Sequence, residues 1–260
     1  MSTTPPVPSP AVPVLEMRHA TVTAMRNPEW VVAAHVNWVV HPGEFWVVGA
    51  PQRAGKSDFL MTASGLMPPR DGAVWFRGER LPIFEEEQLP WRLKLGLVFA
   101  GGQLLHSLSV AENIALPLRY HAHWAEADIQ SRVTQLLEAM ELTPWAHWMP
   151  AQVARSWSQR AGLARVLALA PELLLVDSPL AGLDIRHTWW WLDMLTALSR
   201  GHEIMGGKPL TLCVTAHNLQ PWRHSASHFA CLHQRRFRVL GDWAAVVAQP
   251  AAGVRELLRE

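Results

Sequence analysis

Short apolar runs and amphipathic stretches alternate along the chain, and this pattern predicts an α/β fold. Leu173 to Val176 are four consecutive apolar residues, which is typical of a strand buried on both faces of a parallel sheet. Residues 44–49 form a second apolar strand, and residues 210–216 and 228–240 are expected to continue a mixed sheet. Residues 14–48 contain alternating and apolar runs separated by proline-containing turns, which predicts a β-rich N-terminal region.

A helical block interrupts these strands. Between residues 104 and 165 the apolar spacing becomes helical. Within residues 126–140 an amphipathic helix is predicted, because apolar residues recur at i, i+4, i+7 and i+8: Ile129, Val133, Leu136 and Leu137. We therefore predict one domain over residues 14–250 with a helical subdomain at about 104–165. A disordered Pro/Ser/Thr-rich tail (1–13) precedes it and a helical end (251–260) follows it.

A loop suited to phosphate binding follows the apolar run at 44–49. Gly55-Lys56-Ser57 stands between that strand and a helix-forming segment, residues 59–65. In this context backbone N–H groups cradle phosphates, the lysine reaches the β and γ oxygens, and the serine hydroxyl ligates Mg²⁺. The strict pattern G-x-x-x-x-G-K-[ST] fails, because Ala50 stands where the first glycine belongs.

A second chemical position lies at the end of the strand 173–176. Asp177 falls where open α/β sheets place ligand chemistry. In P-loop ATPases a carboxylate here holds Mg²⁺, usually through water, so Ser57 and Asp177 are the predicted metal ligands. The next position, which usually carries a glutamate that orients the attacking water, is Ser178.

Further motifs follow in a fixed order. Ala-Gly-Leu-Asp at 181–184, Thr-Ala-His-Asn at 215–218 and the segment 150–165 resemble the D-loop, switch-histidine and signature segments of ABC transporter ATP-binding subunits. The resemblance covers roughly residues 13–245, and residues 101–119 resemble the ATPases of Mla/MCE-type phospholipid transport systems. It implies a P-loop NTPase of ABC type, with a mixed RecA-like sheet core, an N-terminal antiparallel β region and an inserted helical subdomain.

The resemblance also implies roles for single residues. His217 is implied as the catalytic histidine that contacts the γ-phosphate and positions water, with Ser178 in place of the glutamate. The implied cofactors are ATP and Mg²⁺, the metal being held by Ser57 and Asp177. The residues implied to bind the nucleotide are Ala50, Arg53, Ala54, Gly55, Lys56, Ser57, Asp58 and Asp184.

Several positions depart from the family pattern. Ala100 replaces the Q-loop glutamine that contacts Mg²⁺, and residues 154–156 (Ala-Arg-Ser) replace the Ser-Gly-Gly core of the signature. Arg53 occupies a loop position where glycine is usual, so strain or an obstructed phosphate cradle is expected. Asp58 is expected to repel the α-phosphate. The retained residues suit holding a nucleotide better than splitting it.

The net charge and the lengths of the apolar runs limit which partners and cellular locations are expected. The net charge of +1 gives no electrostatic footprint for nucleic acid. No apolar run approaches the ~20 residues that span a bilayer, and the N-terminal tail lacks the regions of a signal peptide. We therefore expect a cytoplasmic protein, peripheral to the inner face of the cell membrane and attached there through a partner.

Two conspicuous clusters have structural interpretations. Trp189, Trp190 and Trp191 are adjacent on a predicted helix and face different sides, so packing or subunit contact is expected and not a single base-stacking platform. Arg235, Arg236 and Arg238 are interpreted as a solvated strand edge, since charged edges discourage pairing with other chains.

Two functions remain open. In the first, two ATP-binding subunits sandwich two ATP molecules and drive a membrane permease that moves lipid, with hydrolysis slow or absent. In the second, the chain is a non-hydrolysing pseudo-ATPase with a structural or regulatory role. Whether the chain is an enzyme is thus left undecided by the sequence. The expected partners are a transmembrane permease, an identical or different second ATP-binding subunit, and an MCE-type lipid-binding protein.

Overall fold

The computed structural model describes residues 12–81, 89–122, 124–248 and 252–258, so most of the predicted tail lies outside the described residues. The strands in these ranges form one ten-stranded sheet with the order β5-β4-β1-β2-β10-β9-β3-β8-β7-β6. Their bounds are β1 Leu15–Ala24, β2 Asn27–Val40, β3 Phe45–Gly49, β4 Ala73–Phe76, β5 Glu79–Arg80, β6 Leu95–Val98, β7 Leu173–Val176, β8 Thr211–Ala216, β9 His228–His233 and β10 Arg236–Gly241.

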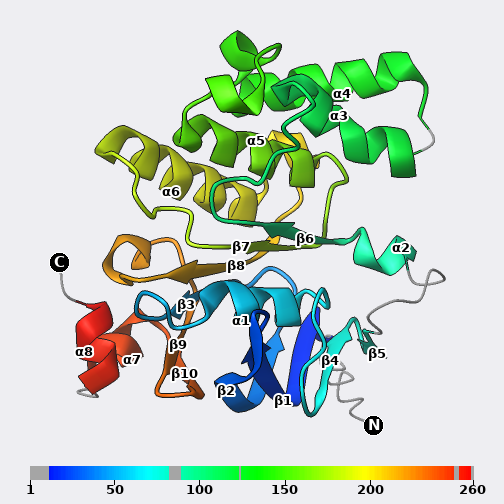
Figure 1. Ribbon diagram of the computed structural model, residues 1–260. Coiled ribbons are helices and arrows are strands. Elements are labelled where there is room, and N and C mark those ends of the chain that lie inside the picture. The colour runs from blue at the N-terminus through cyan, green and yellow to red at the C-terminus, as the bar shows by residue number, and fades with distance from the viewer. Residues whose placement is uncertain (1–11, 82–88, 123, 249–251, 259–260) are drawn as a thin grey trace, which may run out of the picture.

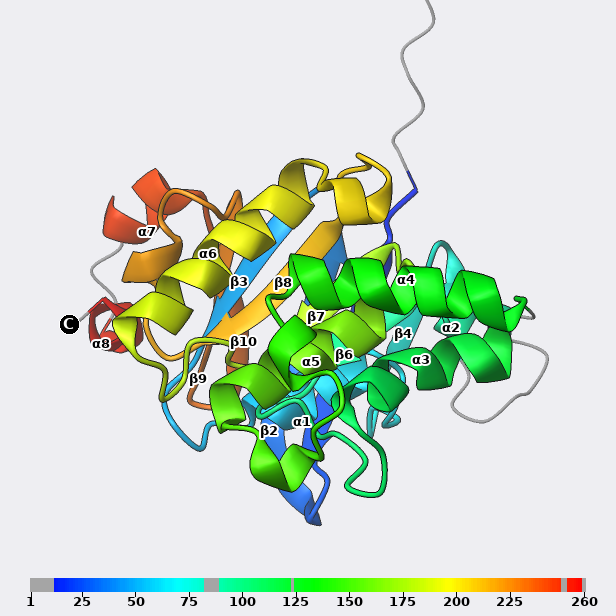
Figure 2. The same ribbon diagram turned by 90° about the horizontal axis from the view of Figure 1, so that it is seen from above.

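Helices cover both sides of the parallel strands (Figure 1). Seen from above, α3, α4, α5 and α6 lie over the strands β6, β7, β8 and β3 (Figure 2), whereas α1 lies between these strands and the N-terminal strands. The α-helices are α1 Lys56–Ala63, α2 Leu89–Arg92, α3 Val110–His121, α4 Glu126–Ala139, α5 Arg155–Leu167, α6 Ile185–Arg200, α7 Trp243–Ala248 and α8 Ala252–Leu257. Short 3₁₀ turns occupy Thr143–Trp145, Pro150–Gln152, Glu203–Met205 and Gln220–Trp222.

The sheet is mixed, as the sequence predicts. Strands β6, β7, β8, β3 and β9 pair in parallel, while β1 pairs antiparallel with both β2 and β4. Strand β10 pairs antiparallel with β9 and parallel with β2, so it lies inside the sheet. The interpretation of Arg235–Arg238 as a strand edge is therefore wrong, because sequence pattern does not fix the order of strands.

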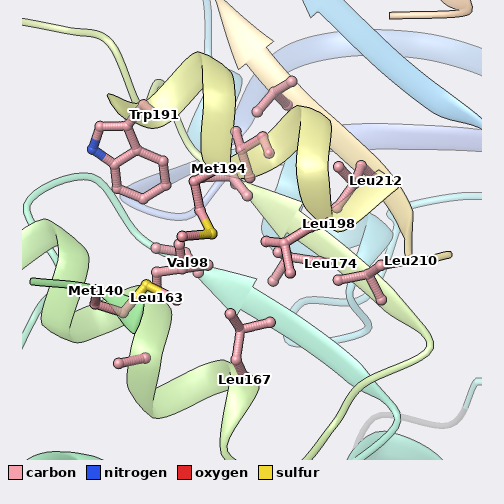
Figure 3. Packing of buried hydrophobic residues seen from close by; sticks show 14 of the residues in the cluster. Val98, Met140, Leu163, Leu167, Leu174, Trp191, Met194, Leu198, Leu210 and Leu212 are labelled. Carbon is pink, nitrogen blue, oxygen red and sulfur yellow. The ribbon is translucent and has the colours of Figure 1, made fainter. Parts of the chain in front are cut away.

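Side chains of the central strands contribute to two hydrophobic cores. Leu174 and Val176 of β7 pack in the core under α5 and α6, and Leu173 and Leu175 pack in the core around α1. Figure 3 shows the first core, where Leu163 and Leu167 of α5 meet the α6 side chains above the sheet. The prediction of a strand buried on both faces is confirmed, since every residue of β7 is buried.

The segment 104–165 folds into α3, α4 and α5. Helix α3 begins with a capping box: the Ser109 Oγ accepts from the Glu112 N–H at 3.3 Å, and the Glu112 carboxylate accepts from the Ser109 N–H at 2.7 Å. Helix α4 buries all four apolar residues of the predicted amphipathic face, which confirms that helix. Among the described residues, no helix is both long and apolar enough to cross a membrane.

Candidate functional site

The loop of residues 50–55 joins β3 to α1 at the carboxyl ends of the parallel strands. Ala50 is fully buried, and its N–H donates to the Ala216 carbonyl of β8 at 2.8 Å, which fixes where the loop begins. Gly55 ends the loop at φ +84°, and a Cβ there would lie 2.6 Å from the Cγ atoms of Val32. Glycine is therefore required at this position for both conformation and space.

Arg53 adopts φ +61°, the left-handed conformation that glycine accepts without cost. A non-glycine residue in this region costs on the order of 1 kcal/mol or more. Its side chain is exposed, so the loop keeps its turn while carrying a long cation on its surface. Ala54, the next residue, is half-buried and bonds through its N–H to the Pro51 carbonyl at 3.3 Å.

Lys56, the first residue of α1, folds over the loop. Its Nζ donates to the carbonyls of Ala50 at 3.0 Å and Pro51 at 2.7 Å. Burial lowers the pKa of Lys56, an effect that the nearby Asp177 carboxylate opposes. The loop thus holds a cation within the turn whose backbone would cradle an anion.

The two predicted metal ligands meet in the structure. The Ser57 Oγ donates to Asp177 Oδ2 at 2.5 Å, although the residues are 120 positions apart. The other carboxylate oxygen, Oδ1, accepts from the Thr215 hydroxyl at 2.9 Å and from the Ser178 hydroxyl at 3.1 Å. A hydroxyl and a carboxylate are oxygen ligands of the kind that Mg²⁺ takes, so this donor set fits the metal.

Thr215 was missed by sequence reasoning, yet it organises the site. Its hydroxyl is fully buried at the end of β8, beside β7, and it also accepts from the Ser178 N–H at 3.0 Å. The signal that could have found it is a polar residue near the carboxyl end of an otherwise apolar strand.

Ser178 is held in an uncommon backbone conformation, with φ +48°. Together with Thr215 and His217 it lines a cavity of about 170 Å³ that also reaches Ala181 and Trp222. His217 is exposed at the mouth of this cavity, directly after β8. A neutral hydroxyl bonded to Asp177 and an exposed imidazole therefore line this cavity.

Asp58 has a structural role that the sequence did not reveal. Its Oδ1 accepts from the Met25 N–H at 2.8 Å and so ties the turn between β1 and β2 to the first turn of α1. A carboxylate in the first turn of a helix is also favoured by the helix dipole. Asp58 thus fixes the N-terminal strands against the first turn of α1, and it also places a negative charge beside the phosphate loop.

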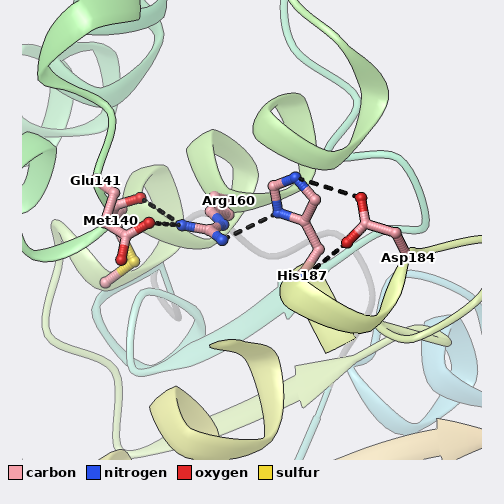
Figure 4. A network of polar contacts seen from close by, with 5 residues as sticks. All are labelled: Met140, Glu141, Arg160, Asp184 and His187. Atoms are coloured by element: carbon pink, nitrogen blue, oxygen red, sulfur yellow. Dashed lines mark hydrogen bonds and ion pairs between the residues drawn. The ribbon is translucent and has the colours of Figure 1, made fainter. Parts of the chain in front are cut away.

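Asp184 belongs to a different cluster, at the start of α6. Its Oδ1 caps the helix by accepting from the His187 N–H at 2.9 Å, and its Oδ2 lies 4.0 Å from His187 Nε2. His187 Nδ1 in turn lies 3.0 Å from an Nη atom of Arg160 (Figure 4). Among the described residues, Asp184 makes no hydrogen bond or ion pair with the phosphate loop.

Arg160 is the centre of that cluster and is completely buried. Its guanidinium ion-pairs with Glu141 at 2.7 Å and lies over the rings of Trp157 and Trp190, at 4.4 and 3.8 Å from their centroids. The expectation for the three adjacent tryptophans is confirmed, because Trp190 packs here while Trp191 is 1% and Trp189 59% exposed. Arg160 lies in the segment that resembles the signature, and His187 follows the segment that resembles the D-loop. The contact between them therefore joins these two segments within one chain.

The signature-like segment forms the start of α5. Ala154 stands at its N-cap with no side chain to accept from the first turn, where a serine hydroxyl could. Arg155 is exposed, and its Nε lies 3.7 Å from the position that a Cβ on Gly101 would take. Its side chain therefore lies against the loop that follows Ala100.

Comparison with known proteins agrees with this geometry. The family described as "ABC transporter" matches residues 33–181. The intermembrane phospholipid transport system ATP-binding protein MlaF of Escherichia coli (strain K12) is 28% identical over 225 residues, covering 86% of this chain and 81% of the relative. The methionine import ATP-binding protein MetN 2 of Pseudomonas aeruginosa (strain UCBPP-PA14) is 30% identical over 212 residues, covering 81% of this chain and 62% of the relative.

Solved structures show the same fold. The ATP-binding cassette MJ0796, in a dimeric post-hydrolysis state bound to ADP and Pi, superposes with a TM-score of 0.76 at 26% identity, covering 88% of this chain and all of that one. A second likeness, to cbiO1 from Clostridium perfringens, has a TM-score of 0.74 at 18% identity over 91% of both chains, and it supports the fold alone. With its matched sequence, its cassette fold and its phosphate loop, the chain belongs to the ABC transporter family.

Proposed function

We propose that the chain is the ATP-binding subunit of an ABC transporter of the lipid type, which binds Mg–ATP and hydrolyses it slowly or not at all. The observation that carries this proposal is the Ser57–Asp177 hydrogen bond of 2.5 Å beside Lys56. It brings together a cation for phosphate and two oxygen ligands for Mg²⁺ at the N-terminus of α1. The similarity to MlaF and the segment 101–119 support the lipid class.

Weak hydrolysis follows from the residues around the γ-phosphate position. Ser178 is neutral at any working pH and its hydroxyl is bonded to Asp177, so it offers no carboxylate to orient water. His217 keeps an exposed imidazole at the same cavity and is the remaining candidate for positioning water. The alternative function, a non-hydrolysing pseudo-ATPase, is favoured by the same substitution at Ser178.

The permease is proposed to dock on the helical segment near α3. Leu105 is 47% exposed in the loop before α3, and Trp148 and Met149 are 43% and 42% exposed where the chain bonds back to the start of that helix. Beside them lies a cavity of about 400 Å³ lined by residues that include Glu112, Arg119, His147 and Met149. Leu104, in the same loop, is 7% exposed and packs in the core, so it is not available to the partner.

Asn113 makes this docking loop rigid. The side chain is fully buried on α3 and accepts from the Leu105 N–H at 2.8 Å, while its amide donates to the carbonyls of Leu105, Leu108 and Ser109. Because these hydrogen bonds hold the loop backbone in place, Leu105 can contact a partner without a large loss of loop conformational entropy on binding. We further propose that two ATP-binding subunits pair, as in the dimeric structure of MJ0796, at the inner face of the membrane.

Calorimetric titration with Mg–ATP tests the proposed function. The unmodified chain should bind Mg–ATP, and Lys56→Ala should weaken binding by about tenfold or more, which corresponds to ~1.4 kcal/mol. Lys208→Ala serves as a matched control, because this lysine is exposed and precedes the amino end of β8, whereas the phosphate loop lies at the carboxyl ends of the parallel strands. Equal affinity in the unmodified chain and Lys56→Ala, or no binding by either, would contradict the proposal.

A further inference from the structure

A third cavity, of about 220 Å³, is lined by residues of β9, β10, the turn between them and α8. These elements lie at the same end of the molecule in Figure 1. It is separate from the phosphate loop and shares no lining residue with the cavity around Ser178. The residues that line it are Cys231, His233, Gln234, Arg236, Arg238, Gly253 and Val254. None of these residues is acidic, and two carry a permanent positive charge.

The two arginines point to the same side of the sheet. Arg236 is paired with His233 across the ladder and Arg238 with Cys231, so all four side chains share one face. Successive residues on one face of a strand are about 7 Å apart, which is close enough for two guanidinium groups to contact one small anion. Burial raises the pKa of the Cys231 thiol, and the positive charge of the nearby Arg238 opposes this rise.

These two guanidinium groups have no internal partner. Both side chains are exposed, and among the described residues neither the Arg236 nor the Arg238 guanidinium makes a hydrogen bond or an ion pair. Other arginines of the chain do: Arg18 pairs with Glu16, Arg77 with Glu172, Arg119 with Glu126 and Arg160 with Glu141. Arg236 does not lie on a free sheet edge, since it pairs with Ala34 of β2 as well as with His233 of β9.

The wall of the cavity is fixed by helix α8. Val254 is 1% exposed and Leu257 is fully buried, and the Leu257 carbonyl accepts from the Leu219 N–H at 2.9 Å. A Cβ on Gly253 would lie 2.6 Å from the His233 ring, so the helix backbone is in close contact with that imidazole. The cavity is therefore bounded by the packed helix α8 on one side and by the strand that carries both arginines on another.

We propose that this cavity binds a phosphate-type dianion through Arg236 and Arg238, with His233 and Gln234 as further hydrogen-bond donors. Two adjacent permanent positive charges, with no acidic residue among those that line the cavity, attract a ligand of charge −2, and planar guanidinium groups match the oxygens of a phosphate in pairs. A free phosphate compound and the phosphomonoester headgroup of a lipid offer this same chemistry. The site is distinct from the proposed nucleotide site, so either proposal can fail without the other.

Calorimetric titration with inorganic phosphate tests this inference, using Lys56→Ala as the background so that the phosphate loop is silenced. We expect binding that the double variant Arg236→Gln/Arg238→Gln weakens by about tenfold or more. The matched control is Arg235→Gln, because this neighbouring exposed arginine lies outside the cavity, at 5.7 Å from the Trp30 ring centroid.

A second experiment distinguishes a lipid headgroup from a free phosphate compound as the ligand. The same proteins are floated with phosphatidylcholine vesicles that contain or lack phosphatidic acid. Flotation that requires phosphatidic acid and both arginines supports a lipid headgroup as the ligand, and binding of inorganic phosphate alone supports a free phosphate compound. Failure in both experiments, or an equal loss in Arg235→Gln and in the double variant, would overturn the proposal.

Discussion

At the residue scale, catalysis turns on what surrounds the γ-phosphate position, and no single substitution accounts for it. We predict that Ser178→Glu alone raises phosphate release less than about tenfold, because Ala100 and the segment 154–156 remain unchanged. The new carboxylate also inherits a backbone at φ +48°, which does not favour a productive geometry by itself.

Replacing all three departures from the family pattern together should raise phosphate release much more, by about 10²-fold or above, since groups that act as a unit are not additive. The combined variant carries Ser178→Glu, Ala100→Gln, Ala154→Ser, Arg155→Gly and Ser156→Gly. Adding Lys56→Ala to it should abolish the gain, which serves as the control. Brisk phosphate release by the unmodified chain would show instead that another residue already performs the catalytic role.

At the element scale, the buried Arg160 joins α5 to α6. We predict that Arg160→Met lowers the free energy of unfolding by about 3 kcal/mol, because it removes two desolvated cation–π contacts and hydrogen bonds to charged groups. Glu141 is half exposed, so loss of its partner adds little further cost. The measurement is urea denaturation, with the exposed Arg155→Met as the control of equal chemistry. A change below about 1 kcal/mol would contradict a central role for this cluster.

His187 gives the same cluster a pH dependence. Burial and the charge of Arg160 lower the pKa of His187 below its usual 6.5, so the folded chain resists protonation there. In the unfolded chain the imidazole takes up its proton at about pH 6.5, and the free energy of unfolding should therefore fall as the pH drops through and below this value. Comparing unfolding free energies at pH 7.5 and 5.5 checks this, and His187→Gln should show a smaller difference. An equal difference in both proteins would exclude His187 as the cause.

At the scale of the whole molecule, local sequence patterns predicted individual strands and helices, but they did not predict which elements lie side by side. The strand at Leu173–Val176 and the helix at Glu126–Ala139 follow from periodicity alone. Thr215 was missed because its contact with Asp177 depends on β8 lying beside β7. The structural role of Asp58 was missed because its carboxylate accepts a hydrogen bond from a turn 33 residues away. Strand order likewise overturned the interpretation of Arg235–Arg238 as an edge.

The last prediction concerns how the whole molecule reaches the membrane. Attachment is proposed to run through the loop before α3, where Leu105 is exposed on a backbone held by Asn113. In cells that make the chain together with its natural partners, Leu105→Asp should move it from the membrane fraction to the supernatant, since a charge cannot be buried in an apolar contact without a partner. Val247→Asp is the matched control, because Val247 is equally apolar and 61% exposed but lies on α7, far from α3 in Figure 1. Unfolding curves should be the same for both variants, as each residue is exposed. Membrane retention of a folded Leu105→Asp variant would place the docking surface elsewhere on the molecule.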